Sequence, residues 1–456
     1  MMGGFGQLYD SSTTTKIPPI DLPYIAALLR DRNYFFKIFD CLGNNWDLNT
    51  LISQLKNEVP DYIAIRTSTP TFEWDLKVAQ KIKENCSAPI IFFGPHSSLF
   101  PMKTLDNDSV DAIILGDPEF TIADLEKKGQ FSDIDGIWYK QNGEIIKNNP
   151  REPINDLNSL PFPAWDLLPY NYYDGGSDLM RNLKPFVLVQ TSRGCPHGCG
   201  YCPYPVAQGK KYRYRSPENI INELEGLVNN LKIKSILFRD PEFALRRGNV
   251  KDICTGIIER KIKLAWRCET RIENLDKELI TIMAEAGCIG INMGIESSDP
   301  AVLLNVGRKA VPFEQAKKII DLCKLKKIDT FCFFIIGLPG ETKESAYKTI
   351  DYATRLDAAF TQFTVATPFF GTRLRIWAEE NNFIENNSPL KITGYDATMR
   401  NEYMTVKEIQ CLQSFANQAV RMKPNKIIKR VLLHPLSGIS EIKRWLKFLK
   451  VKIRGC

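Results

Sequence analysis

The sequence predicts an α/β protein with parallel sheets. Short apolar segments rich in β-branched and aromatic residues alternate with helical stretches in residues 1–150, and the same alternation resumes in residues 186–385. Parallel strands need a crossover connection that is usually a helix, so this alternation favours parallel sheets. Between the two regions, residues 151–185 are rich in Pro, Asn, Asp and Tyr, which is typical of a linker.

Residues 1–150 are predicted to form a doubly wound, Rossmann-like parallel sheet. One of its helices is expected at residues 76–84, and Asn142-Gly143 predicts a hairpin turn. In such a sheet the ligand crevice lies beyond the carboxyl ends of the strands. Those ends carry the turn segments 40–43, 67–71, 94–97 and 116–119. The strands are expected at residues 34–39, 62–65, 90–93 and 112–115.

Residues 186–385 repeat the alternation six times, and residues 386–456 are predicted to form a helical, basic C-terminal extension. In barrels built from such units, catalytic residues gather at the carboxyl ends of the strands and in the loops that follow. The six strands are expected at residues 186–190, 235–238, 264–267, 290–294, 330–336 and 361–366.

The composition is ordinary for a folded globular protein. The 456 residues are 44% hydrophobic and 25% charged. The longest apolar run, around residues 331–338, is far shorter than the ~18 residues that cross a bilayer. Twelve cysteines without a compact disulfide framework or a secretory signal indicate a reducing compartment, so the cytoplasm is the expected location.

The net positive charge comes from the end of the chain. Residues 421–456 hold eleven Lys or Arg and one acid, so they carry +10 and the rest of the chain carries −3. Residues 439–454 place Ile, Leu and Trp on one helical face and Lys and Arg on the other. Such a helix either contacts the inner face of a membrane peripherally or packs on its own domain. A nucleic-acid partner is not expected, because no aromatic-interleaved binding module accompanies the charge.

Three cysteines with distinctive spacing, Cys195, Cys199 and Cys202, stand in the run TSRGCPHGCGYCPYP. Three thiolates can hold three irons of a [4Fe-4S] cluster, which leaves the fourth iron open to an outside ligand. An electron-transfer loop would supply a fourth cysteine, and a structural zinc site would pair two Cys or Cys/His elements. His197 has poor geometry for a metal in so short a loop. The spacing therefore predicts a chemical iron-sulfur site.

This motif, CxxxCxΦC with the aromatic Tyr201 at Φ, resembles that of the radical SAM superfamily. The resemblance implies that residues 186–385 form a partial (β/α)6 TIM-like barrel with the cysteine loop at its mouth. It also implies that S-adenosylmethionine (SAM) chelates the open iron, with Tyr201 beside it. An electron from the cluster then cleaves the sulfonium bond to give methionine and a 5′-deoxyadenosyl radical.

Further phrases in the order expected for the family imply the SAM contacts. After the second strand, Asp240 or Glu242 meets the methionine amino group, although Asp240 is also suited to cap a helix. After the third strand, Arg271 binds the methionine carboxylate or, as an equal alternative, forms a salt bridge with Glu269 or Glu273.

The fourth and fifth strands lead to the implied nucleoside contacts. Glu296 would accept hydrogen bonds from ribose hydroxyls. Ile335 and Gly337 would lie beside adenine, and Glu341 is expected in the first turn of the next helix. Cys268, near the predicted mouth, is expected to be a small buried hydrophobe, with a substrate-facing position as the alternative.

Residues 1–150 resemble the cobalamin-binding domain of one branch of the superfamily, that of class B methyltransferases and anaerobic cyclases. The matching phrases include PDYIAIRTSTPT, FFGPHSSLFP and DAIILGDPEF. Two departures affect the expected cobalamin site: the polar start MMGGFGQLYDSSTTTKI lacks the usual apolar strand, and Phe93-Gly94 stands where the family has two glycines. The implied cobalamin contacts are Thr67, Ser68, Gly94, His96, Gly116 and Glu119.

No protein histidine is expected on cobalt. The DxHxxG signature is absent, because Asp40 is followed by Cys41, Leu42 and Gly43. His96 is expected to be a turn histidine bonded to neighbouring backbone.

These features predict an enzyme that transfers a methyl group to an unactivated carbon. One SAM would yield the radical, and another would supply the methyl group by way of cobalamin. The alternatives are a cobalamin-dependent oxidative cyclase or rearrangement enzyme, a radical SAM enzyme with a vestigial cobalamin domain, and a non-catalytic iron-sulfur redox or sensor protein. Expected partners are a small-molecule or lipid-like substrate and an electron donor such as flavodoxin or ferredoxin.

Overall fold

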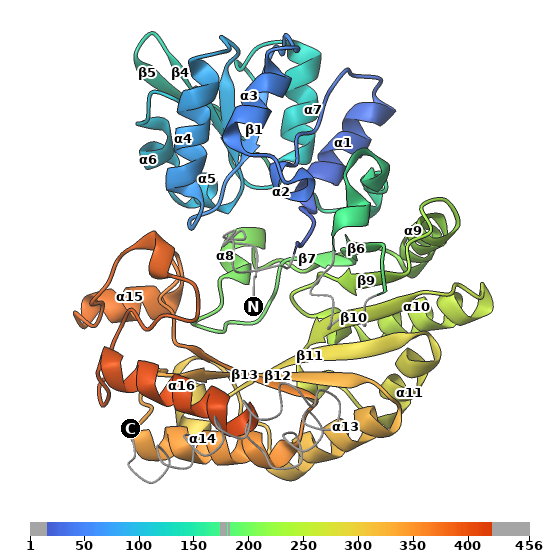
Figure 1. The fold of residues 1–456 in the computed structure, drawn as a ribbon, viewed down its shortest axis with the longest axis vertical. Helices are drawn as coiled ribbons and strands as arrows, with labels where there is room; N and C mark the ends of the chain where they lie inside the picture. Colours follow the sequence, from blue (N-terminus) through green and yellow to red (C-terminus); the bar gives the residue numbers. More distant parts are fainter. Residues whose placement is uncertain (1–15, 174–179, 181–182, 422–456) are drawn as a thin grey trace, which may run out of the picture. The chain divides into compact units, whose positions relative to one another are not determined.

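The computed structural model describes residues 16–173, 180 and 183–421 (Figure 1). The chain divides into two compact units, and each is described by itself. Unit 1 contains residues 1–197, 203–269 and 285–289, and unit 2 contains residues 198–202, 270–284 and 290–456. In the described part of the chain, no helix is both long and apolar enough to cross a lipid bilayer.

The first sheet of unit 1 has five strands in the order β1-β2-β3-β4-β5. The first three are parallel, with Ala64 opposite Ile91 and Phe92 opposite Ile113. The last two form an antiparallel hairpin, and its predicted turn residues Asn142 and Gly143 both have positive φ. The strands are β1 (Ile63–Arg66), β2 (Ile90–Phe93), β3 (Ala112–Ile114), β4 (Ile137–Gln141) and β5 (Glu144–Lys147).

Helices cover both faces of this sheet, and the prediction of an α/β fold with parallel strands is confirmed (Figure 1). Helices α1 and α7 pack on Phe93 and Ile114, while α3, α4 and α6 pack on Phe92 and Ile113. Successive residues of one strand therefore pack into the hydrophobic cores on opposite faces of the sheet. The predicted helix 76–84 is the later part of α4. The helices are α1 (Asp21–Asp31), α2 (Cys41–Asn44), α3 (Leu48–Leu55), α4 (Phe72–Lys83), α5 (Pro95–Leu99), α6 (Pro101–Leu105) and α7 (Glu119–Lys128).

Residues 34–39 do not form a strand, which corrects the prediction. A strand needs a hydrogen-bonded neighbour, and among the described residues none pairs with this segment. Some of its apolar side chains are partly buried instead, because Phe36 and Ile38 pack against Ala26 and Ala164, while Phe35 is 84% exposed. The apolar pattern indicated partial burial but not strand pairing.

The predicted linker has neither strand nor α-helix in its described part. It contains three short 3-10 helices, η1 (Leu157–Ser159), η2 (Trp165–Leu167) and η3 (Tyr170–Tyr172). Trp165 and Tyr173 are fully buried, so this segment is fixed to the fold by aromatic packing. The domain boundaries at residues 150, 185 and 385 stay predictions.

The second sheet has six strands in the order β13-β12-β11-β10-β9-β6. The pairs β6–β9, β9–β10, β11–β12 and β12–β13 are all parallel. Every predicted strand of residues 186–385 is present, so the sixfold alternation is confirmed. The strands are β6 (Phe186–Val189), β9 (Ser235–Phe238), β10 (Ala265–Thr270), β11 (Cys288–Glu296), β12 (Asp329–Ile336) and β13 (Phe360–Val365).

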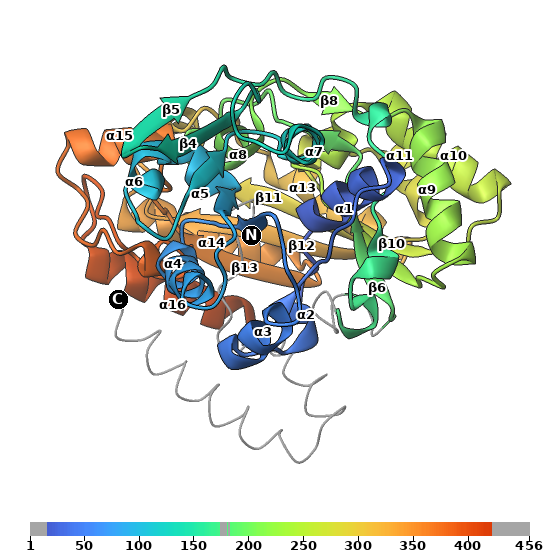
Figure 2. The same ribbon diagram turned by 90° about the horizontal axis from the view of Figure 1, so that it is seen from above.

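Capping residues set the starts of the helices in this region. The side chain of Ser216 accepts from a backbone N–H of α9, and Thr342 and Ser345 form a reciprocal capping box on α14. Helices α9 and α10 lie side by side in both views (Figures 1 and 2). The helices are α8 (Tyr204–Gln208), α9 (Pro217–Asn229), α10 (Arg247–Glu259), α11 (Lys277–Glu285), α12 (Pro300–Asn305), α13 (Phe313–Leu325), α14 (Lys343–Leu356), α15 (Arg373–Glu380) and α16 (Val406–Arg421). The amphipathic segment 439–454 lies outside the described residues.

Candidate active site

The cysteine loop begins in unit 1, after the two-residue strand β7 (Ser192–Arg193), which pairs with β8 (Arg213–Tyr214). Gly194 has a φ of +81°, and a Cβ there would lie 2.1 Å from the carbonyl oxygen of Lys211, so only glycine fits. The backbone N–H of Cys195 donates to the carbonyl of Gly209 at 3.1 Å. The first cysteine is thereby fixed at the edge of the β7–β8 pair.

The second half of the loop belongs to unit 2. The N–H of Gly200 donates to the carbonyl of Val306 at 2.8 Å, and its own carbonyl accepts from the N–H of Leu374 at 2.9 Å. The N–H of Cys202 donates to the carbonyl of Cys199 at 3.2 Å, which closes a turn. Both thiols are half-buried against an apolar cluster from α12 and α15.

The three thiols are a donor set suited to a [4Fe-4S] cluster with one open iron. Burial raises the pKa of Cys199, whereas the guanidinium groups of Arg308 and Arg271 act to lower it. Positive charge beside a thiol favours the thiolate that binds iron. Among the described residues, no three His, Cys, Asp or Glu side chains already converge on a metal position. The three cysteines therefore remain proposed ligands.

Glu296, at the end of β11, lies in a buried hydrogen-bond network. Its Oε1 accepts from the hydroxyl of Tyr201 at 2.9 Å and from Arg308 Nη1 at 2.9 Å, while Arg308 Nη2 donates to the carbonyl of Gly294 at 3.0 Å. Burial raises the pKa of Glu296, and Arg308 opposes that shift. Its Oε2 is buried and has no hydrogen-bond partner in the structure. This oxygen is an acceptor available to a ligand.

Local backbone geometry supports this arrangement. Glu296 has a φ of +67°, an unusual value for a residue with a side chain. The register between β11 and β12 shifts between Gly294 and Glu296. A Cβ on Gly294 would lie 2.3 Å from Glu296 Oε1, so the glycine makes room for the folded-back carboxylate.

Arg308 was missed by the sequence reasoning. In the sequence it precedes Lys309, a pair typical of solvated surface, but its side chain is only 4% exposed. Arg308 follows Glu296 by twelve residues in the sequence, with α12 between them, and this spacing was the available signal. Only the fold shows that the helix returns this guanidinium to the carboxylate.

Asp240, at the end of β9, is fully buried in unit 1. Its Oδ1 accepts from the N–H and hydroxyl of Thr191, at 3.0 and 2.9 Å, and from the hydroxyl of Ser192 at 2.6 Å. Burial raises its pKa to about 6, against the effect of these donors. Its Oδ2 is buried without a partner in the structure. No helix follows at once, so Asp240 is not the helix cap considered above.

Glu242 contacts the cysteine loop directly. Its Oε2 accepts from His197 Nε2 at 2.8 Å, and its side chain is 2% exposed. His197 is thus engaged by a carboxylate through one ring nitrogen. The two candidates for the methionine amino group therefore differ. Asp240 has one carboxylate oxygen without a partner among the described residues, whereas the carboxylate of Glu242 is bonded to His197 of the loop.

Arg271 lies 3.9 Å from Glu273, a long ion pair between partly exposed groups. Glu269, the other partner considered for Arg271, accepts from Arg239 Nη1 at 2.7 Å. Arg239 was not predicted. An ion pair of Arg271 with Glu273 is thus present, and its carboxylate-binding role stays a prediction.

The turn after β12 is closed by buried polar groups. Gly337 has a φ of +91° and donates to the carboxylate of Glu341. Glu341 lies before α14, which corrects its expected place in the first turn of that helix. Burial raises the pKa of Glu341 to about 8. The side-chain amide of Asn401 donates to two carbonyls of this turn, so Ile335 and Gly337 lie on a rigid support.

The loops after β1 and β2 are joined at Gly94. A Cβ on this glycine, whose φ is +110°, would lie 2.5 Å from the carbonyl oxygen of Thr67. Thr67 in turn donates to Asp75 at 2.7 Å, and the hydroxyls of Ser68 and Thr71 are 2.8 Å apart. In the loop after β3, the backbone N–H of Gly116 bonds the hydroxyl of Ser98 at 3.1 Å. A Cβ at Gly116 would have no described atom within 4 Å beyond its chain neighbours.

His96 differs from its prediction. Its Nδ1 lies 3.2 Å from the hydroxyl of Thr69, so it bonds a side chain and not neighbouring backbone. The ring stacks on Phe72 at 3.9 Å between centroids. Burial lowers its pKa to about 4, so the imidazole is neutral at pH 7. Its Nε2 and the hydroxyl of Ser97 are buried without partners in the structure.

Glu119 is a member of a buried charge network in unit 1. Arg193 Nη2 donates to Glu119 at 2.6 Å, and Arg193 Nη1 lies 3.3 Å from Asp117. Arg213 also bonds Asp117 and donates to the carbonyl of Ile154 at 2.9 Å. We call these four side chains, Asp117, Glu119, Arg193 and Arg213, the arginine clasp. It joins the loop after β3 to the strand that enters the cysteine loop.

Cys268 is fully buried in β10, so it is the small core residue that was expected. Its substrate-facing alternative is wrong. Its pKa is raised by burial and by hydrogen bonding to Cys288.

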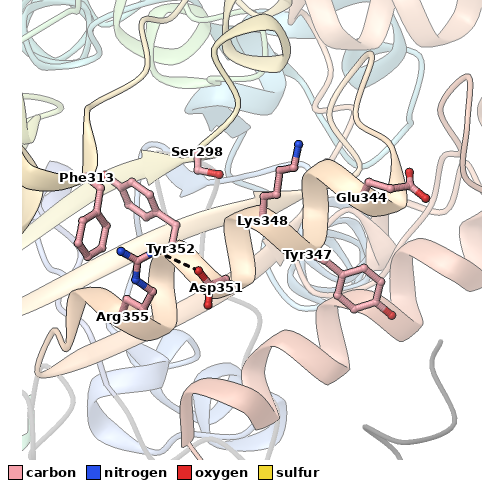
Figure 3. A pocket seen from close by; sticks show the side chains of 8 residues that line it. All are labelled: Ser298, Phe313, Glu344, Tyr347, Lys348, Asp351, Tyr352 and Arg355. Atoms are coloured by element: carbon pink, nitrogen blue, oxygen red, sulfur yellow. Dashed lines mark hydrogen bonds and ion pairs between the residues drawn. The ribbon is translucent and has the colours of Figure 1, made fainter.

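Two hollows lie in unit 2 beside α12, α13 and α14. One, of about 520 Å³, is lined by Ser298, Glu344, Lys348 and Arg355 among others, and contains none of the predicted site residues (Figure 3). The other, of about 600 Å³, shares Ser298 with the first and includes Arg308 and Lys309.

Comparison with known proteins identifies the family. Residues 189–353 match the family model described as the radical SAM superfamily. A relative from Pyrococcus horikoshii, named as an uncharacterized methyltransferase, is 32% identical over 92% of this chain and 91% of its own length. The chain belongs to the radical SAM superfamily. It is therefore an enzyme of the class that uses a [4Fe-4S] cluster and SAM, and the resemblance seen in the cysteine motif is confirmed. The non-catalytic alternative is excluded.

Other radical SAM proteins resemble the chain more distantly. An anaerobic magnesium-protoporphyrin IX monomethyl ester cyclase of Rubrivivax gelatinosus is 26% identical over 77% of this chain and 64% of the cyclase. Among solved structures, OxsB with aqua-cobalamin and SAM has a TM-score of 0.72 at 18% identity, over 96% of this chain and 69% of OxsB. The methyltransferase TsrM from Kitasatospora setae has a TM-score of 0.68 at 20% identity, over 80% and 72%. At these identities the structural likeness is one of fold.

Proposed function

We propose that this chain is a cobalamin-dependent radical SAM methyltransferase that acts on an unactivated carbon of a small molecule. The observation that carries the proposal is the match to a methyltransferase relative along nearly the whole of both chains. Further support comes from a cytidylyl-2-hydroxyethylphosphonate methyltransferase of Streptomyces wedmorensis, 23% identical over 82% of this chain and 80% of its own. We also propose that the six β/α units form the partial barrel of the family.

The residues present fit SAM and its cluster. Cys195, Cys199 and Cys202 would hold three irons, and the bound cluster would supply the electron that cleaves SAM. The free Oε2 of Glu296 would accept from a ribose hydroxyl, while Tyr201 and Arg308 hold the carboxylate in place. These three buried side chains orient the nucleoside without themselves changing protonation.

The first sheet also fits a cobalamin ligand. The unpartnered Nε2 of His96 and hydroxyl of Ser97 offer polar contacts, and the open space beside Gly116 lets a bulky group approach the backbone. Thr67, Ser68 and Gly94 would shape the same crevice. Glu119 Oε1 accepts from Arg193, while its Oε2 is buried without a partner among the described residues, so Glu119 stays a proposed contact.

A cyclase is the second candidate, because a named cyclase is among the relatives. The two reactions differ in their use of SAM. Methyl transfer consumes one SAM as methyl donor, giving S-adenosylhomocysteine, besides the one that gives 5′-deoxyadenosine. A cyclase gives 5′-deoxyadenosine alone. An electron donor such as flavodoxin or ferredoxin is needed for both, and the cytoplasm remains the predicted location.

The deciding experiment is anaerobic reconstitution with iron, sulfide and hydroxocobalamin, followed by incubation with dithionite, methyl-deuterated SAM and a small-molecule extract. Methyl transfer predicts both nucleoside products in a substrate-dependent manner and a metabolite heavier by one labelled methyl group. 5′-Deoxyadenosine with an altered but unlabelled metabolite would support the cyclase. Absence of 5′-deoxyadenosine from a fully reconstituted protein would refute both.

A further inference from the structure

The second half of the cysteine loop reaches the surface of unit 2 with little cover. Gly198 and Gly307 are both exposed. A Cβ on Gly307, whose φ is +73°, would lie 2.8 Å from the carbonyl oxygen of Gly198, so the two backbones touch. Arg373 donates to that same carbonyl from its exposed side chain.

The surrounding surface residues are connected to the loop interior. Val306 and Leu374 bond the two backbone groups of Gly200, which stands between Cys199 and Cys202. Gly307 and Arg373, which are next to these anchors in the chain, therefore lie close to the backbone that carries Cys199 and Cys202. Electron transfer rates fall steeply with distance, so this edge is favourable for electron entry.

The chemical character of this edge is apolar and cationic. Leu304 and Ile376 are 74% and 51% exposed. Lys309 is exposed and lines the hollow of about 600 Å³ together with Leu304. Two nearby carboxylates are already engaged, because Asp299 caps α12 and Glu379 bonds Arg375 at 2.6 Å. We call Gly198, Leu304, Gly307, Lys309, Arg373 and Ile376 the loop-edge surface.

We propose that the loop-edge surface is the docking site of a small acidic redox protein that reduces the cluster. This inference rests on the proposed function. The donor's carboxylates pair with Lys309 and Arg373, and the apolar rim of its flavin or iron-sulfur group covers Leu304 and Ile376. One electron passes from the reduced donor to the cluster, so the donor is oxidised by one electron and the cluster reduced by one. Weak redox encounters of this kind use small interfaces whose charges govern association.

The test compares a protein donor with a small chemical reductant. Lys309→Glu and Leu304→Asp are made in the full-length chain, with Lys324→Glu on α13, whose side chain is 72% exposed, as the matched control. Formation of 5′-deoxyadenosine is measured with dithionite and with reduced flavodoxin. We expect about a tenfold lower kcat/KM for flavodoxin in both loop-edge variants at low salt, with wild-type rates under dithionite. The control should match the wild type with both reductants.

Each outcome is decisive. Flavodoxin-driven rates equal to wild type in both loop-edge variants overturn the docking site, and so does an equal loss under both reductants, which would mean damage to the SAM site. Loss of the salt dependence of the flavodoxin KM in Lys309→Glu supports it. If the wild type forms no 5′-deoxyadenosine under dithionite, the proposed function fails, independently of docking.

Discussion

Single side chains in the site are positioned by burial and by several hydrogen bonds to one of their oxygens. Glu296 shows this most clearly, because Tyr201 and Arg308 both bind one carboxylate oxygen and leave the other as an acceptor. Asp240 repeats the pattern with three donors on one oxygen. A buried acceptor without a partner is costly, so a ligand that supplies a donor gains that free energy on binding.

Glu296→Gln is expected to weaken SAM binding by about tenfold to a hundredfold, which corresponds to the ~1.5–3 kcal/mol of a hydrogen bond to a charged group. The amide keeps one acceptor oxygen, and both Tyr201 and Arg308 compete for it. Equilibrium dialysis of SAM against the reconstituted protein would measure the loss. Glu344→Gln, a fully exposed acid on α14, serves as control. Unchanged SAM affinity in Glu296→Gln would remove this residue from the site.

Cys199→Ala is expected to abolish SAM cleavage entirely, because two thiolates cannot hold a cube with one open iron. Iron content and the EPR signal of the reduced cluster report the loss. Cys268→Ala, in the buried core of β10, should keep both. Wild-type cleavage by the Cys199 variant would contradict the cluster assignment.

The buried carboxyl of Glu341 should make stability depend on pH. Its pKa is raised to about 8 by burial, whereas in the unfolded chain it is near 4.3. Between these pH values the native state keeps a proton that the unfolded state loses, so the free energy of unfolding falls as pH rises, by at most about 1.4 kcal/mol per pH unit. Anaerobic urea titrations from pH 5 to 8 should show a flatter profile for Glu341→Gln. Parallel profiles would mean that Glu341 is ionised when folded.

At the scale of secondary structure, turns set by glycine place the ligand-facing loops. Gly94 and Gly116 both follow parallel strands and both have positive φ, but only Gly94 lies against another backbone. The loop after β2 can therefore lie against the loop after β1 only because residue 94 has no side chain. The loop after β3 has room for a side chain at residue 116.

Gly94→Ala is expected to destabilise the protein by more than Gly116→Ala. Both substitutions carry the ~1–2 kcal/mol of a left-handed residue. Only at position 94 would the new Cβ meet the carbonyl oxygen of Thr67, at 2.5 Å, so β1 or β2 must shift. Urea midpoints of the two variants give the comparison. Equal midpoints would show that the close approach is relaxed at no cost.

The sequence predicted the elements better than their pairing and burial. Apolar alternation located all six strands of the second sheet, because each is a short β-rich segment between turns. It also assigned residues 34–39 to a strand, since burial against Ala26 and Ala164 gives the same pattern as pairing. The motif spacing led to the three cysteines, and the family resemblance to Glu296, as proposed site residues. Arg308 and Arg239 were missed because the sequence alone does not distinguish a buried arginine from one on the surface.

For the molecule as a whole, cobalamin binding by the first sheet separates the proposed methyltransferase from an enzyme with a vestigial domain. The purified protein is expected to bind hydroxocobalamin with a stoichiometry near one, and EPR of the reduced cobalt(II) form should show no splitting from an axial histidine nitrogen. His96 is the one histidine in residues 1–150 of the sequence, and its ring is stacked on Phe72 and bonded to Thr69. His96→Phe should therefore leave the spectrum unchanged. SAM cleavage without cobalamin binding at any concentration would support a vestigial domain.

The arginine clasp limits how this protein can be recombined with its relatives. Arg193 and Arg213 lie beside the cysteine loop, whereas Asp117 lies in the loop after β3 and Glu119 is the first residue of α7, and all four are largely buried. A chimera that took residues 1–150 from a relative lacking these acids would leave two guanidinium groups buried without counter-charge, at a cost of about 3–5 kcal/mol each. Residues 1–150 therefore cannot be exchanged freely with those of a relative. A compatible relative must have carboxylates at the positions of Asp117 and Glu119.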